Sequence, residues 1–476
     1  MINQINIGQN TIMQMLGRTG AIAVALITMG VITRYLGRDG YGDYTTIIAF
    51  LQIIWIFTDF GLQMISIQSI SEKGADESEV LSNLLSLRIF LSIVSLGLTF
   101  LVTFLTPYPR IIKVGIIFAS LSFFLNSISV ILYSVYQKYL LMGKLALADT
   151  LSKIIILAFT AIFAWLNHGL LWIVLAMNLG TVFLFIFIFY YANRKIKIKY
   201  RVNYRIWKKI IGKTLPLAIT ISLNLLYFKG DIVILSFYRS ASEVGLYGAP
   251  YRVLEVLINF IYLFLGLLMP QITFYYSSKN FDALKKVMQF GYDILVVFSF
   301  PIILGTLLIG PQLMKFIAGN EFAVSGDVLK ILIFATVAIF FASLFGYLIV
   351  SANKQKETIK FYFVNAVISL TAYFIFIPKY GFWAAAVITL ISETFILATS
   401  FYIAKRIFVF KADLTLARKA ALASLIMSLA LYFIRTAPVL LSLALAVAVY
   451  FSALYILGGF SKETIFKIFN LKKERT

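Results

Sequence analysis

Cysteine is absent from this chain of 476 residues, and histidine occurs once, as His168. The missing thiols exclude disulfides, iron–sulfur clusters and thiolate zinc sites. His168 lies in a predicted surface turn, where we expect it to be structural. The sequence therefore predicts no metal centre, no bound cofactor and no catalytic triad.

Charged residues are also scarce, at 13% of the chain against about 25% in soluble domains. Hydrophobic residues make up 61%, and the mean hydropathy is +0.93. Apolar runs of about twenty residues, enough to cross a ~30 Å hydrocarbon core, recur along the whole chain. We predict an all-α polytopic membrane protein with fourteen transmembrane helices. No connection between them is long enough for a soluble catalytic domain, so a transporter is favoured over a membrane polymerase or glycosyltransferase.

The charges that are present are mostly basic, with 42 Lys and Arg against 20 Asp and Glu. In a soluble protein the net charge of +22 would suggest a nucleic-acid partner. Here Lys and Arg gather in alternate connections, and the positive-inside rule then places both termini in the cytoplasm. Residues 1–10 lack the basic start of a cleavable signal peptide, so we expect the first span to direct insertion. The predicted location is the inner (cytoplasmic) membrane, with membrane lipids and no nucleic acid as partners.

Two pairs of similar segments indicate an internal duplication. Gly42 corresponds to Gly245 and Tyr44 to Tyr247 at one constant offset, and 169–191 resembles 381–403 later in the same order. Copies of six spans insert the same way up, which makes a parallel repeat. We predict two six-helix lobes related by a pseudo-two-fold axis, plus two appended helices. The expected parts are an N-lobe (1–193), a basic cytoplasmic linker (194–209), a C-lobe (210–405), helices 13 and 14 (406–459) and a cytoplasmic tail (460–476).

The most specific motif begins in the seventh predicted span, 210–236. It has the pattern N-x-x-Y-x-x-x-D from Asn224 to Asp231, followed by V-G-x-Y-x-A over 244–249. The first lobe has G-x-x-G-x-G-x-Y over 37–44. Together with the span count, these patterns resemble the Wzx-type flippases of polysaccharides and lipid-linked oligosaccharides. That family belongs to the multidrug/oligosaccharidyl-lipid/polysaccharide (MOP) exporter superfamily.

The resemblance implies a MATE/MOP-like fold that flips a polyprenyl-diphosphate-linked oligosaccharide, such as an O-antigen repeat unit, to the outer leaflet. It also implies alternating access in a monomer, driven by H⁺ or Na⁺ antiport or by the membrane potential. Polysaccharide polymerase or export machinery would be a partner. Two alternatives stay open: a MATE-like exporter of drugs or metabolites, and a lipid II flippase. The basic excess inside the first lobe favours an anionic ligand over the cationic drugs.

Ionisable residues inside the predicted spans are the candidate site, because a charge at the bilayer centre costs at least ~2.5–3.5 kcal/mol. In the first lobe they are Arg18, Asp59, Arg88 and Lys153. Arginine can contact two phosphate oxygens at once, so this basic group suits a diphosphate. We expect the three cations to bind the substrate and Asp59 to act in ion coupling or gating. The alternative for Arg88 and Lys153 is that they snorkel to the headgroups.

The second lobe carries Lys229, Asp231, Arg252, Glu255 and Glu393. The i, i+3 spacing predicts an Arg252–Glu255 ion pair. A two-residue step turns about 200° on a helix, so Lys229 and Asp231 should find partners elsewhere. The candidates are Glu255 for Lys229 and Arg252 for Asp231. A purely structural network of ion pairs is the alternative.

These residues are assigned two roles. Glu393 is either a lone protonatable site or the partner of Lys360. Tyrosine rings can stack on sugars, which brings Tyr227 into the site. The predicted substrate-binding residues of this lobe are Lys229, Arg252, Tyr227 and Asn224, and the predicted ion-coupling or gating residues are Asp231, Glu255 and Glu393.

Overall fold

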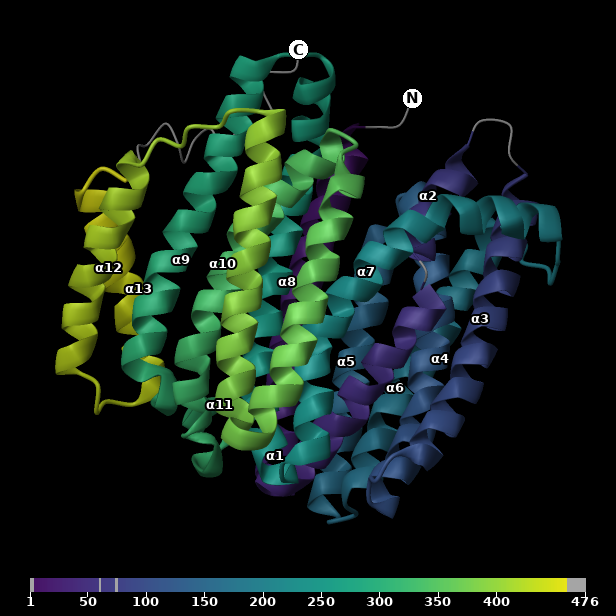
Figure 1. The fold of residues 1–476 in the computed structure, drawn as a ribbon, viewed down its shortest axis with the longest axis horizontal. Helices are drawn as coiled ribbons and strands as arrows, with labels where there is room; N and C mark the ends of the chain where they lie inside the picture. Colours follow the sequence, from purple (N-terminus) through teal and green to yellow (C-terminus); the bar gives the residue numbers. More distant parts are fainter. Residues whose placement is uncertain (1–3, 60, 73–75, 460–476) are drawn as a thin grey trace. The chain divides into compact units, whose positions relative to one another are not determined.

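The computed structural model describes residues 4–59, 61–72 and 76–459. These residues form α-helices and two short 3₁₀ turns, without a strand (Figure 1). The helices are α1 Gln4–Asp59, α2 Leu62–Ser71, α3 Glu77–Leu105, α4 Arg110–Lys138, α5 Met142–Trp165, α6 Leu170–Lys195, α7 Tyr204–Tyr238, α8 Ala241–Ser277, α9 Phe281–Ala318, α10 Ser325–Ser351, α11 Ile359–Ile407, α12 Thr415–Phe433 and α13 Val439–Ile456.

Twelve of the described helices, all except α2, are long and apolar enough to cross a membrane. Two of them are each a pair of helices joined at a glycine with positive φ: Gly37 (φ 65°) in α1 and Gly381 (φ 59°) in α11. Glycine reaches this region without the steric penalty of a Cβ, so the chain can turn there within a few residues. Dividing α1 and α11 at these glycines gives fourteen spans, which confirms the predicted number.

The second span has a further break inside it. α1 ends at Asp59, and α2 begins at Leu62 after Gly61, whose φ is 70°. The span is therefore two helical pieces and not one continuous helix. A break of this kind leaves the last carbonyls of the first piece without helical partners. The first candidate site lies at this break.

The helices cluster into two compact units, and each is described by itself. Unit 1 contains Met1–Ala249, Ile317–Glu321 and Ile359–Ile388. Its buried core joins α2, α3, α4, α5 and α6, with Tyr136 fully buried, and a second cluster joins α1, α4 and α6 around Ile47 and Ile116. Unit 2 contains Pro250–Phe316, Phe322–Thr358 and Thr389–Thr476. The division of the chain into an N-lobe and a C-lobe stays a prediction.

The two predicted extra helices are α12 and α13 of unit 2. Their core includes Met427, Leu431 and Tyr450 and extends to Val297 of α9. The Tyr450 hydroxyl donates a hydrogen bond to the Val297 carbonyl at 2.7 Å. The pair is therefore packed against α9 by both apolar contact and a buried hydrogen bond.

The basic linker runs along the start of α3. Ser78 Oγ donates to the Lys197 carbonyl at 2.6 Å, and the Lys199 amide donates to Ser82 Oγ at 3.1 Å. Asn203 then caps α7 by accepting the Arg205 amide at 3.1 Å. The connection between α6 and α7 is therefore held in place by α3.

Candidate functional site

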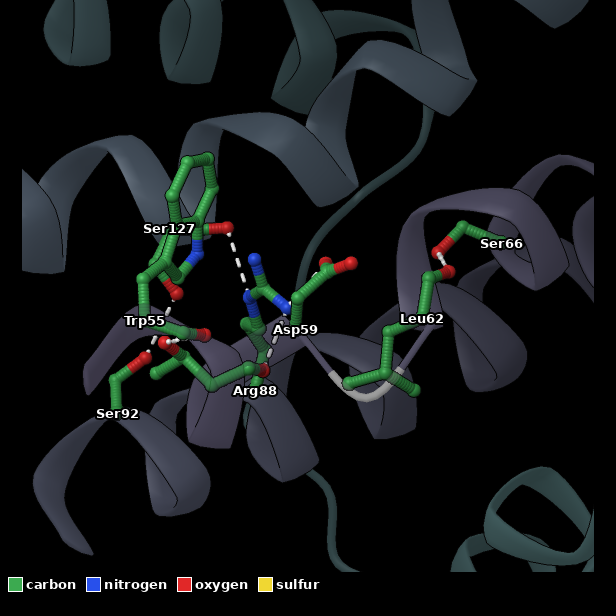
Figure 2. A network of polar contacts seen from close by, with 8 residues as sticks. Trp55, Asp59, Leu62, Ser66, Arg88, Ser92 and Ser127 are labelled. Carbon is green, nitrogen blue, oxygen red and sulfur yellow. Dashed lines mark hydrogen bonds and ion pairs between the residues drawn. The ribbon is translucent and has the colours of Figure 1, made fainter. Parts of the chain in front are cut away.

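The side chain of Arg88, on α3, lies at the break in the second span (Figure 2). Its Nη1 donates to the Thr58 carbonyl at 2.6 Å and to Asp59 Oδ1 at 2.8 Å. Its Nε donates to the Ser127 carbonyl of α4 at 3.1 Å. The guanidinium thus supplies a donor to a carbonyl at the end of α1 and joins three helices at one point.

The Asp59–Arg88 ion pair is largely buried. The Arg88 side chain is 0% exposed and that of Asp59 is 19% exposed. Arg88 therefore does not snorkel to the headgroups in this conformation, because its charge is held inside the helix bundle by Asp59. Both residues were predicted from the sequence, but their pairing was not. Their roles in substrate binding and ion coupling stay predictions.

The other two candidate cations of the predicted N-lobe come from neighbouring helices. Lys153 lies on α5 and is partly buried. Arg18 lies on α1, and its side chain is outside the described residues. α1 and α5 are in close contact next to it, because Thr150 Oγ1 donates to the Gly17 carbonyl at 3.1 Å. The fold therefore brings the Arg18 backbone to the helix that carries Lys153.

The two motif charges in the second half of α7 are deeply buried. Asp231 is 0% and Lys229 5% exposed. The Tyr247 hydroxyl of α8 donates to Asp231 Oδ2 at 2.5 Å, and the Ile232 amide donates to Oδ1 at 2.7 Å. Tyr247 belongs to the same motif as Asp231, yet sequence reasoning named Arg252 as the partner. The proposed pairs of Lys229 with Glu255 and of Asp231 with Arg252 stay a prediction.

Two polar residues of the same helix contact each other. Asn224 Nδ2 donates to the Tyr227 hydroxyl at 2.7 Å. The Tyr227 ring is only 1% exposed. A sugar would reach this ring only after the surrounding helices move, so the predicted stacking role requires another conformation.

In unit 2, the ion pair predicted from the i, i+3 spacing on α8 is confirmed. Arg252 Nη1 and Glu255 Oε2 lie 2.7 Å apart, with side-chain exposures of 43% and 16%. Glu393 of α11 is buried, at 3% exposure. In unit 1, the Lys360 ammonium lies over the Phe361 ring, 4.9 Å from its centroid. No group of three or more His, Asp or Glu suited to a metal ion occurs in the described part of the chain.

The two repeated motifs contact each other within unit 1. A Cβ added at Gly42 would overlap the carbonyl oxygen of Ala241, and one added at Gly245 would overlap the carbonyl oxygen of Arg38. Arg38 and Ala241 correspond to each other at the same offset that relates Gly42 to Gly245. The contact is therefore reciprocal between the two copies. The sequence singled out both glycines but not their contact, which we call the glycine crossing.

Unit 2 contains an apolar cavity that sequence reasoning missed. Its volume is about 340 Å³. Residues of α8, α9, α10, α12 and α13 line it, among them Leu257, Phe298, Pro301, Met427 and Phe451. Residues that face lipid, residues packed in the core and residues that line this cavity are all apolar. Hydropathy therefore cannot distinguish a cavity-lining residue from the others.

Comparison with known proteins finds a matching family and two similar relatives. The model of a family described as polysaccharide biosynthesis protein matches residues 7–275. The capsular polysaccharide biosynthesis protein CapF of Staphylococcus aureus is 24% identical over 381 residues, covering 79% of this chain and 94% of the relative. A putative O-antigen transporter of Shigella dysenteriae is 21% identical over 380 residues, covering 76% and 91%.

Solved structures share the fold. The lipid II flippase MurJ, in an inward closed conformation, superposes with a TM-score of 0.76 at 16% identity, over 97% of this chain and 100% of that one. An inward-facing MATE family transporter of the MOP superfamily gives 0.68 at 14% identity, over 81% and 94%. The chain is thus a multi-pass membrane protein with a MOP-superfamily fold, and it belongs to the polysaccharide biosynthesis protein family.

Proposed function

We propose that this protein flips a polyprenyl-diphosphate-linked oligosaccharide from the cytoplasmic to the outer leaflet of the inner membrane. Both termini would be cytoplasmic, as the distribution of Lys and Arg indicates. The family, the names of the two relatives and the flippase fold support a lipid-linked sugar as the substrate. The observation that carries the substrate class is the basic excess among the intramembrane charges of the predicted N-lobe, with Arg18, Arg88 and Lys153 against Asp59.

Arg88 would take part through exchange of its partner. In the described conformation its charge is neutralised by Asp59 at 2.8 Å. A substrate diphosphate offers several anionic oxygens, and it would compete with the Asp59 carboxylate for the guanidinium. Release of Asp59 would leave a carboxylate free to bind H⁺ or Na⁺. Substrate binding and ion coupling would then be linked through one buried pair.

The apolar cavity of unit 2 would suit the lipid part of the substrate. Its volume of about 340 Å³ holds a stretch of isoprenoid chain, and its lining is almost entirely apolar. Burying apolar chain contributes about 0.8 kcal/mol per CH₂ relative to water. The headgroup and the carrier would therefore be recognised by separate parts of the protein.

Alternating access requires contacts that close and open, and the glycine crossing is one such contact. Two helix segments that touch backbone to backbone can separate without repacking any large side chain. Because Gly42 and Gly245 each contact the other repeat at the same point, tilting of the two repeats away from the repeat axis would open both contacts together. We infer that the crossing closes the outer face when the protein is loaded from the cytoplasm.

Lipid II is the second candidate substrate, because the lipid II flippase structure covers 97% of this chain. It also carries a polyprenyl diphosphate and differs in the sugar. A polysaccharide polymerase or export protein would receive the flipped product. We propose transport by a single copy of the chain, without chemical conversion of the substrate.

A reconstituted flipping assay tests the residue assignments. Arg18→Ala removes a phosphate donor and Asp231→Asn removes a buried charge. Hydrogen bonds to charged groups are worth about 1.5–3 kcal/mol, so each variant should slow flipping by about 10- to 100-fold. Lys285→Ala, which removes an exposed charge at the start of α9, is the matched control and should keep the parental rate. Parental rates for both site variants would show that these assignments are wrong.

A further inference from the structure

The outer part of α3 has an inverted polarity. Beyond Arg88, every buried residue of this helix is a hydroxyl: Ser92, Ser95, Thr99 and Thr103. Apart from Gly97, its exposed residues are large and apolar, including Ile93, Phe100, Leu101 and Phe104. The helix therefore turns its apolar side to lipid and a row of hydroxyls inward, which we call the hydroxyl file.

Close packing of small residues is the ordinary explanation for such a row in membrane helices. It accounts for Ser92, whose Oγ lies 2.8 Å from Ser127 Oγ, and for Thr99, whose Oγ1 donates to the Ser95 carbonyl at 2.8 Å. It does not account for Ser95 Oγ and Thr103 Oγ1, which are buried without a hydrogen-bond partner in the described part of the chain. Buried polar groups of this kind are normally satisfied by protein or by ordered water.

A cavity lies beside these hydroxyls. About 20 Å³ of it is open to the centre of a water molecule, and about 10–15 Å³ is needed to hold one. Its polar lining consists of Thr58, Ser92, Ser95, Thr99, Ser120 and Trp55. The indole Nε1 of Trp55 is also buried without a partner among the described residues. The space and the donors and acceptors that a bound water needs therefore occur together.

The cavity adjoins the Asp59–Arg88 pair. Thr58, which lines it, accepts a hydrogen bond from Arg88 through its carbonyl. Ser92 also lines it, and its hydroxyl contacts the hydroxyl of Ser127 (Figure 2). The backbone carbonyl of Ser127 accepts a hydrogen bond from Arg88. Arg88 Nη2 has a donor that finds no partner within the described residues.

From these observations we propose that the hydroxyl file is a water site. Ordered water occupies the cavity between Trp55, Ser95 and Ser120 and hydrates the route toward the Asp59–Arg88 pair. The occupant is water, and its use is to solvate the two charges when they separate. This use rests on the proposed partner exchange at Arg88, whereas the presence of water does not depend on which substrate is carried.

Cysteine accessibility distinguishes a hydrated file from dry packing. The chain has no cysteine, so in the single variants Ser95→Cys and Thr99→Cys all thiol labelling comes from the introduced residue. Only a thiol that ionises in water reacts with a small water-soluble methanethiosulfonate reagent. In proteoliposomes we expect both variants to react at least about tenfold faster than Leu101→Cys, on the lipid-facing side of the same helix. Rates equal to that of Leu101→Cys for both variants would overturn the proposal.

Filling the cavity provides the second arm. Ser120→Phe, made in the Thr99→Cys background, should lower its reaction rate to that of the Leu101→Cys control. Ser120→Val removes the hydroxyl and adds less volume than phenylalanine. It keeps the test available if the larger side chain prevents folding, and it should lower the rate partly. An unchanged rate in the folded variants would show that the reagent reaches Thr99 by another route, against this site. Neither arm measures transport, so failure of the proposed function would leave the result interpretable.

Discussion

Arg88→Met should destabilise the folded protein by about 3–5 kcal/mol, because removing one partner of a buried ion pair leaves an uncompensated charge. The loss should be at the upper end of that range. Arg88 also supplies hydrogen bonds to the Thr58 and Ser127 carbonyls, and the first of these closes the broken helix end. Equilibrium unfolding of the purified protein in mixed micelles measures the change.

A double-substituted protein separates the charge from the packing. Asp59→Asn combined with Arg88→Met removes both charges and should be more stable than Arg88→Met alone. The matched control is Lys354→Met, because Lys354 pairs with Glu357 at 3.2 Å with 53% and 38% exposure. An exposed pair contributes about 0–1 kcal/mol, so that variant should unfold like the parent. If the free energy of unfolding of Arg88→Met were also within about 1 kcal/mol of the parent's, the buried pair would contribute no more than an exposed one, against this account.

Gly42→Val and Gly245→Val should each force the glycine crossing apart. The added Cβ would overlap a backbone carbonyl oxygen, of Ala241 in one case and of Arg38 in the other. A backbone atom cannot rotate away as a side chain can, so the helix segments themselves must move. Overpacking of this kind costs typically about 1–3 kcal/mol or more, enough to displace the equilibrium between closed and open conformations.

A cysteine at Thr46 reports the opening of the crossing. Thr46 is 2% exposed, and its hydroxyl donates to the Gly42 carbonyl at 2.9 Å. In a Thr46→Cys background, either glycine substitution should raise the rate of labelling by a membrane-impermeant maleimide several-fold. Gly97→Val and Gly266→Val are the controls, because a Cβ at either position meets open space. Equal labelling in all four variants would show that the glycines do not hold this contact closed.

The sequence predicted the features that depend on composition and local spacing. Fourteen spans follow from hydropathy because every membrane-spanning residue faces either lipid or other helices. The Arg252–Glu255 pair follows from helix geometry, since both residues lie on one face of α8. Gly42 and Gly245 could be identified because the same glycine is retained at corresponding positions of a repeat.

Features that depend on tertiary packing could not be predicted. Arg88 meets Asp59 because a helix breaks at Gly61 and exposes a carbonyl, and hydropathy does not register a break of a single residue. Tyr247 of α8 donates to Asp231 of α7, and the spacing of charges along single helices gave no reason to expect this hydroxyl as a partner. The apolar cavity and the water site depend on how well side chains fill the space between helices, which no single-helix pattern encodes.

One measurement tests the central proposal most directly. The purified protein is reconstituted into liposomes with a fluorescent polyprenyl-diphosphate oligosaccharide in one set and a cationic dye in another, under an imposed H⁺ or Na⁺ gradient. The proposed function predicts movement of the lipid-linked oligosaccharide between leaflets, slowed by Arg18→Ala and unaffected by Lys285→Ala, and no efflux of the dye. Efflux of the dye without movement of any polyprenyl-diphosphate sugar would contradict it and would assign the chain to the exporters that share its fold.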